Sequence, residues 1–185
     1  MQTKGFTLIE LLVVIAILVI LSVAVILTLN PAQLLKQSRD STRIQDMASL
    51  KSAVSFYLAD VNPLVVGSTN TCYGSSVFTP GTPGCGGRMV AATVSTTTVA
   101  NQASTTGAGW MPINFAAISS GSPLGSEPVD PVNDATYFYS YATNGSPQYQ
   151  FEIDADMEST KYADVESKDG GTSATLYEVG THLGL

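Results

Sequence analysis

The feature that most constrains this chain is an uncharged apolar run at residues 11–29. It reads LLVVIAILVILSVAVILTL. A helix of about 19 apolar residues is long enough to cross a hydrocarbon core of about 30 Å. Ordinary secretory signals have an apolar region of roughly 7–15 residues, followed by a small-residue cleavage site. This run is longer and no such site follows it, so we expect one membrane-spanning helix that stays with the protein.

The apolar run is the first half of a helix that we expect from residue 6 to about residue 59. Asn30-Pro31 interrupts it, because proline removes one backbone hydrogen bond and bends a helix. Residues 30–61 are the amphipathic continuation. Their apolar residues at helical spacing are Ile44, Met47, Leu50, Val54, Tyr57 and Leu58. We expect this face to pack on the protein's own sheet, and the remaining positions hold Lys36, Arg39, Asp40, Arg43, Asp46 and Lys51.

Residues 62–125 are rich in glycine, serine, threonine and proline, and Arg88 is their one charged residue. We expect a loop-rich insertion with one or two short strands. The segment contains the only two cysteines, Cys72 and Cys85. Two cysteines in an exported domain predict one disulfide, which would restrain this glycine-rich stretch. A pair of buried free thiols is the alternative.

Residues 126–185 have the pattern of a small antiparallel sheet. Aromatic and β-branched residues mark three candidate strands, Tyr137–Tyr141, Tyr149–Ile153 and Thr175–Val179. Asn144-Gly145 is a turn signal between the first two. We therefore expect an α+β fold, in which a long N-terminal helix, membrane-spanning in its first half, packs on a small antiparallel β-sheet head.

The charge of the head limits its partners. Residues 127–178 hold eleven aspartates and glutamates against Lys161 and Lys168. Because phosphate contacts need a basic surface, we expect the head to bind no nucleic acid. An acidic surface suits solubility outside the cell, or the binding of divalent cations.

The segment before the apolar run is the most informative about function. Residues 1–5 form a short leader with one basic residue, Lys4, and end in Gly5; Phe6 follows, and Glu10 lies at the edge of the span. This arrangement resembles the processing signal of type IV pilins and of the pseudopilins of type II secretion. The resemblance implies that a membrane-embedded prepilin peptidase cuts between Gly5 and Phe6 on the cytoplasmic side. The same enzyme would then methylate the new amine of Phe6.

Glu10 places a carboxylate at the head of an apolar helix, where a charge is costly in lipid. One interpretation is that Glu10 reaches the headgroup region. The resemblance implies another, in which Glu10 pairs with the Phe6 amine of a neighbouring subunit. That amine is largely protonated at pH 7. Such a pair would fix the axial register between subunits, and we favour this interpretation.

Part of the head also resembles the major pseudopilins. Those proteins carry a Pro-x-Asp-Pro turn ahead of a tyrosine-rich hairpin, as Pro128–Asn133 and the strands after it do here, and some bind calcium in the following loop. Calcium takes six to eight oxygen ligands. The candidate ligands for a structural calcium ion are Asp130, Asn133, Asp134, Asp164, Glu166 and Asp169. A solvated acidic loop without metal is the alternative.

No residue pattern indicates catalysis. His182 is the only histidine and lies close to the C-terminus. Two cysteines do not make a zinc site, and the sequence has no nucleophile elbow, P-loop or dinucleotide glycine fingerprint. We therefore expect no enzyme activity and no cofactor other than the calcium ion.

Taken together, the resemblance implies a structural subunit of an extracellular type IV pilus-like fibre. The precursor would reside in the cytoplasmic membrane, and residues 6–29 would become the fibre core. The implied partners are copies of the same chain, the prepilin peptidase, the assembly platform in the membrane and the inner membrane itself. The alternatives are a pseudopilin of a type II secretion system and a non-polymerising single-pass membrane protein with a calcium-binding head.

We predict that Gly5→Leu blocks processing. Glycine offers no side chain to obstruct a narrow cleavage site, whereas leucine does, so the chain should remain at precursor mass in the membrane. An immunoblot that separates the precursor from the mature form checks this. Normal maturation of the variant would contradict the role given to Gly5.

Overall fold

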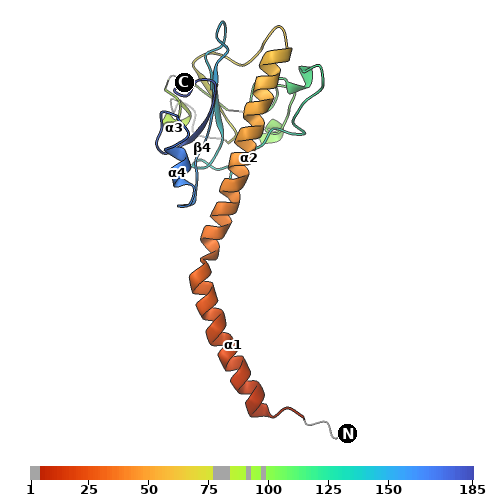
Figure 1. The fold of residues 1–185 in the computed structure, drawn as a ribbon. Coiled ribbons are helices and arrows are strands. Elements are labelled where there is room, and N and C mark those ends of the chain that lie inside the picture. The colour runs from red at the N-terminus through yellow and green to blue at the C-terminus, as the bar shows by residue number, and fades with distance from the viewer. Residues whose placement is uncertain (1–4, 77–83, 91–92, 97–98) are drawn as a thin grey trace. The chain divides into compact units, whose positions relative to one another are not determined.

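The computed structural model describes residues 5–76, 84–90, 93–96 and 99–185. The chain divides into two compact units, Met1–Lys36 and Gln37–Leu185. The described part of the first unit is mainly helical. The second unit is a head in which a helix packs on a sheet (Figure 1). The α+β fold expected from the sequence is therefore confirmed.

The first unit contains α1 (Leu8–Leu29) and the first turns of α2 (Pro31–Asp60). Between the two helices, Asn30 has a left-handed backbone conformation with φ 39°. A left-handed residue cannot continue a right-handed helix, so α1 ends there. Pro31 then begins α2, where its missing N–H and fixed φ suit the first helical position. The predicted interruption at Asn30-Pro31 is confirmed, and it separates two helices.

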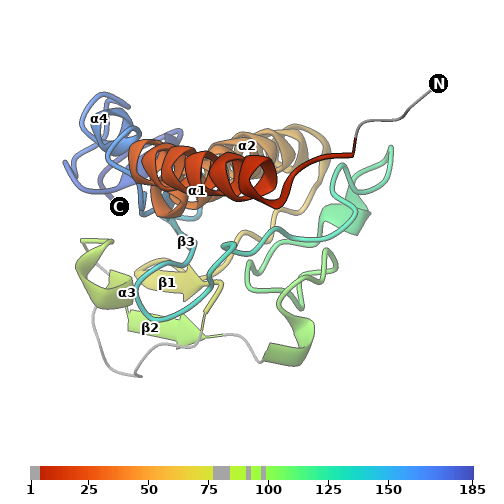
Figure 2. The ribbon, with the colours of Figure 1, turned by 90° about the horizontal axis from the view of Figure 1, so that it is seen from below.

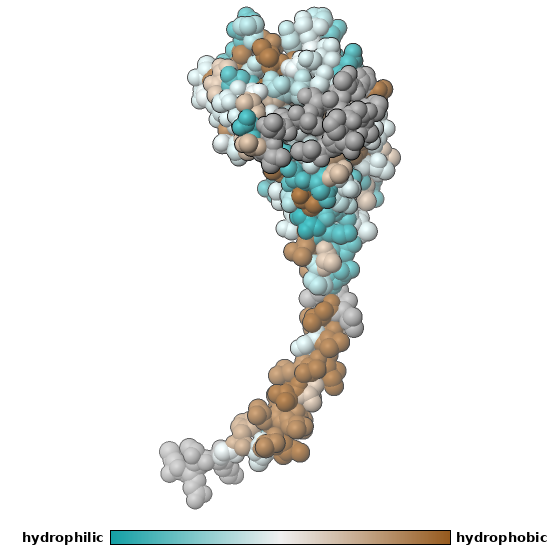
Figure 3. Space-filling model, turned by 180° about the vertical axis from the view of Figure 1, so that it is seen from behind, coloured by the Kyte–Doolittle hydropathy of each residue, from teal (hydrophilic) through white to brown (hydrophobic). Residues whose placement is uncertain are grey.

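Along Leu8–Ile26, the surface of α1 is apolar apart from Glu10 and Ser22. All side chains from Leu8 to Ile26 are exposed, and Figure 3 shows them as an almost continuous apolar surface. The one hydroxyl of this stretch, on Ser22, donates a 2.7 Å hydrogen bond to the carbonyl of Leu18. That polar group is therefore satisfied within the helix. By length and composition, Leu8–Ile26 is the one helix in the described residues that could cross a membrane.

The head contains a five-stranded sheet in the order β2-β1-β3-β4-β5. Its strands are β1 (Thr71–Gly74), β2 (Thr93–Thr96), β3 (Ser140–Thr143), β4 (Phe151–Ala155) and β5 (Tyr177–Gly180). Four of them, β1, β3, β4 and β5, form the antiparallel sheet that the sequence predicts. β2 adds a parallel edge beside β1, which a connection of this length permits. Segment 62–125 thus contributes two strands to the sheet.

Short helical turns connect these strands. They are α3 (Gly84–Gly87), η1 (Val99–Asn101), η2 (Phe115–Ala117) and α4 (Ala163–Glu166).

Strands β3, β4 and β5 begin two or three residues later than the sequence predicts. Asp134 delays β3, because its carboxylate accepts 2.8 Å hydrogen bonds from the N–H groups of Thr136 and Tyr137 and folds the chain into a turn. Tyr149 delays β4, because its left-handed backbone, with φ 51°, is incompatible with a strand. Local turn geometry therefore takes precedence over the β propensity of the aromatic residues.

From residue 37 onward α2 covers one face of the sheet (Figures 1 and 2). Its buried apolar residues are Met47, Leu50, Ala53, Val54 and Tyr57. They meet a core that includes Trp110, Phe115, Tyr139, Tyr141, Phe151, Ile153 and Val179. The predicted packing of the apolar stripe on the sheet is confirmed.

A smaller core covers the opposite face of the sheet. Cys72 of β1 lies directly across from Ala142 of β3 and forms a disulfide with Cys85 of α3. The two Cα atoms are 5.8 Å apart. Met89 and Phe138 pack beside this disulfide. The structure thus contains the disulfide that the sequence predicts, which holds α3 against the sheet.

Two charged residues of α2 are fully buried, contrary to their expected place on its charged side. The exposed fraction of both Asp40 and Arg43 is 0%. Arg43 donates two hydrogen bonds to Asp130, of 2.6 and 2.9 Å, and one of 2.7 Å to Asp40. An oxygen of Glu158 lies 2.8 Å from the same guanidinium. The expectation was wrong because helical spacing does not reveal partners that lie far away in the sequence.

This ion network ties α2 to two distant segments of the head. The carboxylate of Asp40 accepts hydrogen bonds from the backbone N–H groups of Glu158, at 2.9 Å, and Ser159, at 2.8 Å. Arg39 adds a second cation beside Glu158. Burial disfavours the charge of Arg43, but its hydrogen bonds to Asp130, Asp40 and Glu158 raise its pKa overall. The guanidinium therefore stays charged.

Another buried acid is Glu127, with an exposed fraction of 1%. Its Oε2 accepts a 3.1 Å hydrogen bond from the N–H of Met111. Its Oε1 has no hydrogen-bond partner among the described residues. Burial raises the pKa of Glu127 to about 8, so this carboxyl group resists ionisation in the folded head.

We predict that Arg43→Met destabilises the head by about 3–5 kcal/mol, because it leaves buried carboxylates without their cation. Chemical unfolding of the full chain in detergent micelles, followed by circular dichroism, measures this. Lys51→Met, at an exposed position of the same helix, is the matched control and should change stability little. A loss in Arg43→Met no larger than that of the control would contradict the network's role.

We predict that Glu127→Gln stabilises the head at alkaline pH. A folded-state pKa of about 8, against 4.5 for the ordinary group, means that the stability from this carboxyl group is complete below pH 4.5 and is lost as the pH rises through about 8. Glutamine stays neutral and escapes this loss, a difference on the order of 2–4 kcal/mol. Unfolding at pH 5 and pH 8.5 tests this. An equal difference between variant and parent at both values would refute it.

Candidate processing and assembly site

The N-terminus of α1 is capped by two residues that hydrogen-bond each other reciprocally, Thr7 and Glu10. Glu10 donates its backbone N–H to the hydroxyl of Thr7, at 3.3 Å. In return, Oε2 of Glu10 accepts a 2.8 Å hydrogen bond from the N–H of Thr7 and a 2.6 Å bond from its hydroxyl. This arrangement is a capping box, which satisfies N–H groups that the first turn of a helix leaves free.

The capping box gives Glu10 a partner that neither sequence-based interpretation included. The signal was present in the sequence, since Thr7 and Glu10 have the three-residue spacing of a capping box ahead of an apolar run. A negative group is also favourable at the N-terminal end of a helix, where the helix dipole is positive. The carboxylate is thus satisfied within its own chain while α1 lies alone.

The expected cleavage site lies just before this cap. Gly5 and Phe6 are outside α1, and both are exposed, Phe6 with an exposed fraction of 83%. A Cβ atom added at Gly5 would meet no atom within 4 Å. The chain itself therefore does not require glycine at position 5, and any requirement must come from a molecule that binds this segment.

Three of the six expected calcium ligands lie in or beside the Pro128–Asn133 segment, and each has a protein partner. Asp130 holds Arg43, and Asp134 holds the turn before β3. The side-chain oxygen of Asn133 accepts a 2.9 Å hydrogen bond from Ser75. These three side chains fix the path of the chain in front of the sheet.

The other three expected ligands lie between β4 and β5, with Asp164 and Glu166 in α4 and Asp169 in the loop that follows. Asp164 forms an exposed ion pair with Lys168, at 2.6 Å. Glu166 accepts a 2.8 Å hydrogen bond from the N–H of Met157. Asp169 accepts hydrogen bonds from two backbone N–H groups, those of Gly171 and Glu178. Calcium at these residues stays a prediction.

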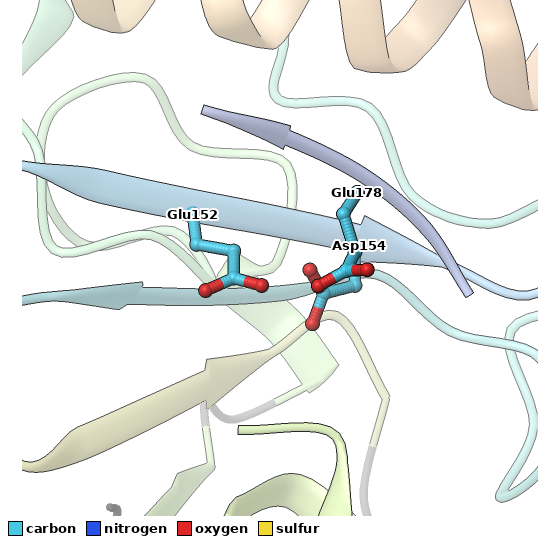
Figure 4. Close-up of side chains that lie close together, drawn as sticks. All are labelled: Glu152, Asp154 and Glu178. Atoms are coloured by element: carbon cyan, nitrogen blue, oxygen red, sulfur yellow. The ribbon is translucent and has the colours of Figure 1, made fainter. Parts of the chain in front are cut away.

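A different set of acids comes together on the sheet. In the described part of the chain, the acidic side chains close enough to share one ion are Glu152 and Asp154 of β4 and Glu178 of β5 (Figure 4). Burial raises the pKa of Asp154 above its ordinary value. Burial and a hydrogen bond with Glu178 raise the pKa of Glu152 to about 7. The sequence pattern does not reveal this set, because Glu178 joins it only through strand pairing.

Comparison with known proteins identifies the N-terminal segment and not the head. Residues 1–26 match the family model described as the prokaryotic N-terminal methylation motif. No curated protein and no solved structure matches the chain. The matched residues include the leader, Gly5, Phe6, the capping box and most of α1. The chain therefore carries, at its N-terminus, the methylation motif that is the signature of type IV pilins and pseudopilins.

Proposed function

We propose that this chain is the precursor of a structural subunit of an extracellular type IV pilus-like fibre. The observation that carries the proposal is an apolar helix, exposed along Leu8–Ile26, that begins directly after the Gly5-Phe6 signal and bears one acid in its first turn. A helix that is apolar on every side is not stable in water. It needs a membrane before assembly and a dry core of packed helices afterwards.

Processing by a prepilin peptidase is the first step of this proposal. Gly5 and Phe6 are exposed and lie outside any helix or strand, so an extended backbone can enter an enzyme cleft without unfolding α1. Cleavage would make Phe6 the N-terminal residue, immediately before the cap residue Thr7. Methylation of the new amine retains its positive charge.

Assembly is the second step, and it uses a change of partner at Glu10. In the precursor, the Glu10 carboxylate is occupied by Thr7 of its own chain. In a fibre, the Phe6 amine of a neighbouring copy would be a cation in an apolar core, and Glu10 is the one acid of the span that could neutralise it. Glu10 would thus exchange its hydrogen bonds with the neutral Thr7 for a charge pair with the amine. This exchange favours the assembled state, because an unpaired buried cation costs far more free energy than a lost helix cap.

The partners and location follow from the same steps. The precursor would reside in the cytoplasmic membrane with its head exported, the assembly platform would extract it, and the fibre would be a homopolymer at the cell surface. A pseudopilin of a type II secretion system is a second candidate, because the Pro128–Asn133 segment ahead of the tyrosine-rich strand is held as a fixed part of the head by Asp130, which is buried against Arg43. Sheared surface fibres distinguish the two, since a secretion pseudopilus remains in the cell envelope.

We predict that the mature protein lacks residues 1–5 and carries one added methyl group on Phe6. Intact-mass spectrometry of protein purified from the membrane and from sheared fibres measures both changes. A mature mass equal to that of the full 185-residue chain would contradict the proposal. Correct processing without fibres would favour a subunit that does not polymerise by itself.

We predict that Glu10→Val and Glu10→Gln are both cleaved normally but lower fibre abundance at least tenfold. Each removes the charge that pairs with the Phe6 amine. Glutamine keeps an oxygen that can cap the N–H of Thr7, whereas valine removes the cap as well. The measurement is the number of sheared fibres in electron micrographs, after the mature mass of each variant is confirmed.

Ser22→Val is the matched control, because it also replaces a polar side chain by valine within the exposed span, and its fibres should persist. Normal fibres from Glu10→Gln, with few from Glu10→Val, would assign Glu10 to helix capping alone. Normal fibres from both variants would remove Glu10 from the assembly mechanism.

A further inference from the structure

Three carboxylates lie on the face of the sheet that points away from α2 (Figure 4). Side chains alternate between the two faces along a strand. Ile153 of β4 and Val179 of β5 face the core beneath α2, so Glu152, Asp154 and Glu178 project to the other side. The exposed fractions of these acids are 1%, 0% and 3%. We refer to them as the back-face acids.

The strand register forces the back-face acids together. Asp154 lies directly between Ser140 of β3 and Glu178 of β5, and Glu152 is the next residue of β4 on the same face. Like charges directly opposite each other destabilise a sheet. A one-residue slip would separate them, but it would also turn Ile153 out of the main core. The packing of the other face therefore holds the acids in place.

The spacing of the acids fits a single ion. One carboxylate oxygen from each lies within 4.8 Å of the others. Calcium binds oxygens at about 2.3–2.6 Å, so ligands on opposite sides of the ion are about 4.6–5.2 Å apart. The ligand type also fits, because hard divalent cations prefer carboxylate oxygens.

Asp154 supplies an independent observation. Its side chain is fully buried, and Oδ1 has no hydrogen-bond partner among the described residues. Its other oxygen receives a 3.4 Å hydrogen bond from the hydroxyl of Ser140. A buried polar atom normally has a partner, and a bound ion is one way to supply it. Oδ1 therefore indicates a ligand within this group of acids.

Arg88 is a cation near the back-face acids, but its side chain already has other partners. Arg88 donates 2.6 Å hydrogen bonds to the carbonyls of Thr136 and Phe138 and lies over the Phe138 ring. Its ion pair is with Asp156, at 3.9 Å. One guanidinium cannot neutralise three buried carboxylates in addition, and leaving them uncompensated is costly.

The geometry points to a binding site for one calcium ion, held by Glu152, Asp154 and Glu178 on the back face of the sheet. Three carboxylates can supply up to six oxygens, and the Ser140 hydroxyl lies beside them. Magnesium would need a near-ideal octahedron and would keep several waters, so a buried, irregular set of oxygens favours calcium.

Binding would also order the chain that covers this face. Oε2 of Glu152 accepts hydrogen bonds from the N–H groups of Gly184 and Leu185, at 2.7 and 2.5 Å. Oε2 of Glu178 accepts a 2.7 Å bond from Ser173. Such outer hydrogen bonds orient metal ligands. An ion at the back-face acids would thus fasten the C-terminus and the loop before β5 to the sheet.

The test uses the full chain in detergent micelles at pH 7.5, freed of metal with a chelator. Isothermal titration with calcium chloride should show one site per chain. At a free calcium concentration 100-fold above Kd, the Tm of the head should rise by about 5–10 °C. Magnesium chloride should produce a smaller rise at the same concentration. The site does not depend on fibre assembly, so its test is separate from that of the proposed function.

Two variants and a control assign the binding to these residues. Asp154→Asn and Glu178→Gln should each abolish the calcium-induced rise in Tm, and Asp154→Asn should raise the Tm of the metal-free protein by removing a buried charge. Asp164→Asn removes an exposed acid of α4 and should leave the rise intact. If Asp154→Asn does not fold, the stoichiometry of the parent and the loss in Glu178→Gln decide the assignment.

Three results would overturn the inference. The first is a parent protein whose heat of titration and Tm are unchanged by millimolar calcium, which would mean that protons neutralise the back-face acids. The second is a calcium-induced rise that persists in Asp154→Asn or Glu178→Gln. The third is a rise that is lost in Asp164→Asn, which would place the ion at α4.

Discussion

The buried guanidinium of Arg43 is the interaction on which the arrangement of the head depends. It binds Asp130 with two hydrogen bonds, Asp40 with one, and lies within ion-pair distance of Glu158. Those acids come from α2, from the segment before β3 and from the segment after β4. One side chain thereby fixes the helix to two loops, whereas the apolar contacts of α2 are non-directional. The apolar stripe supplies most of the driving force for docking, and the ion network selects its position.

The two faces of the sheet are built on different principles. Toward α2, aromatic and aliphatic side chains such as Tyr141, Phe151 and Ile153 form the main core. Away from α2, the disulfide between Cys72 and Cys85 closes a small apolar patch beside the back-face acids. Segment 62–125 covers part of this second face and supplies both cysteines and Arg88. The insertion is therefore part of the fold, because without it the sheet would lose β1 and β2, and this face of β3 would lose its cover.

The N-terminal segment differs from the head in how its side chains are partnered. The side chains of α1 from Leu8 to Ile26 are exposed, and its one acid accepts hydrogen bonds from Thr7. The other features of the segment suit the proposed transfer from a membrane to a fibre core. The Gly5-Phe6 step is exposed, and the helix surface is largely apolar. The Glu10 carboxylate is held by a neutral group, which a cationic partner could replace. The head, in contrast, holds Arg43 and its acidic partners in an internal ion network. The methylation motif thus lies in the first unit, and the main apolar core lies in the second.

Local patterns in the sequence were sufficient for features that depend on neighbouring residues. The span, the break at Asn30-Pro31 and the apolar stripe of α2 all follow from composition and spacing along the chain. The methylation motif was recognised by its resemblance to the processing signal of type IV pilins. The disulfide also followed, because there are only two cysteines to pair. The capping box also depends on neighbouring residues, because Thr7 and Glu10 have the three-residue spacing that it needs.

Only the tertiary structure decided which charged residues are buried and what they meet. Asp40 and Arg43 have the spacing of exposed helix residues, and their burial depends on Asp130 and Glu158, more than 80 positions away. Glu152, Asp154 and Glu178 form one group because strand register, set by the core on the opposite face, places β5 beside β4. A sequence pattern reports the side of a helix or strand on which a residue lies. The cost of burying a charge is set by its partners in space, and these are fixed only when distant segments pack together.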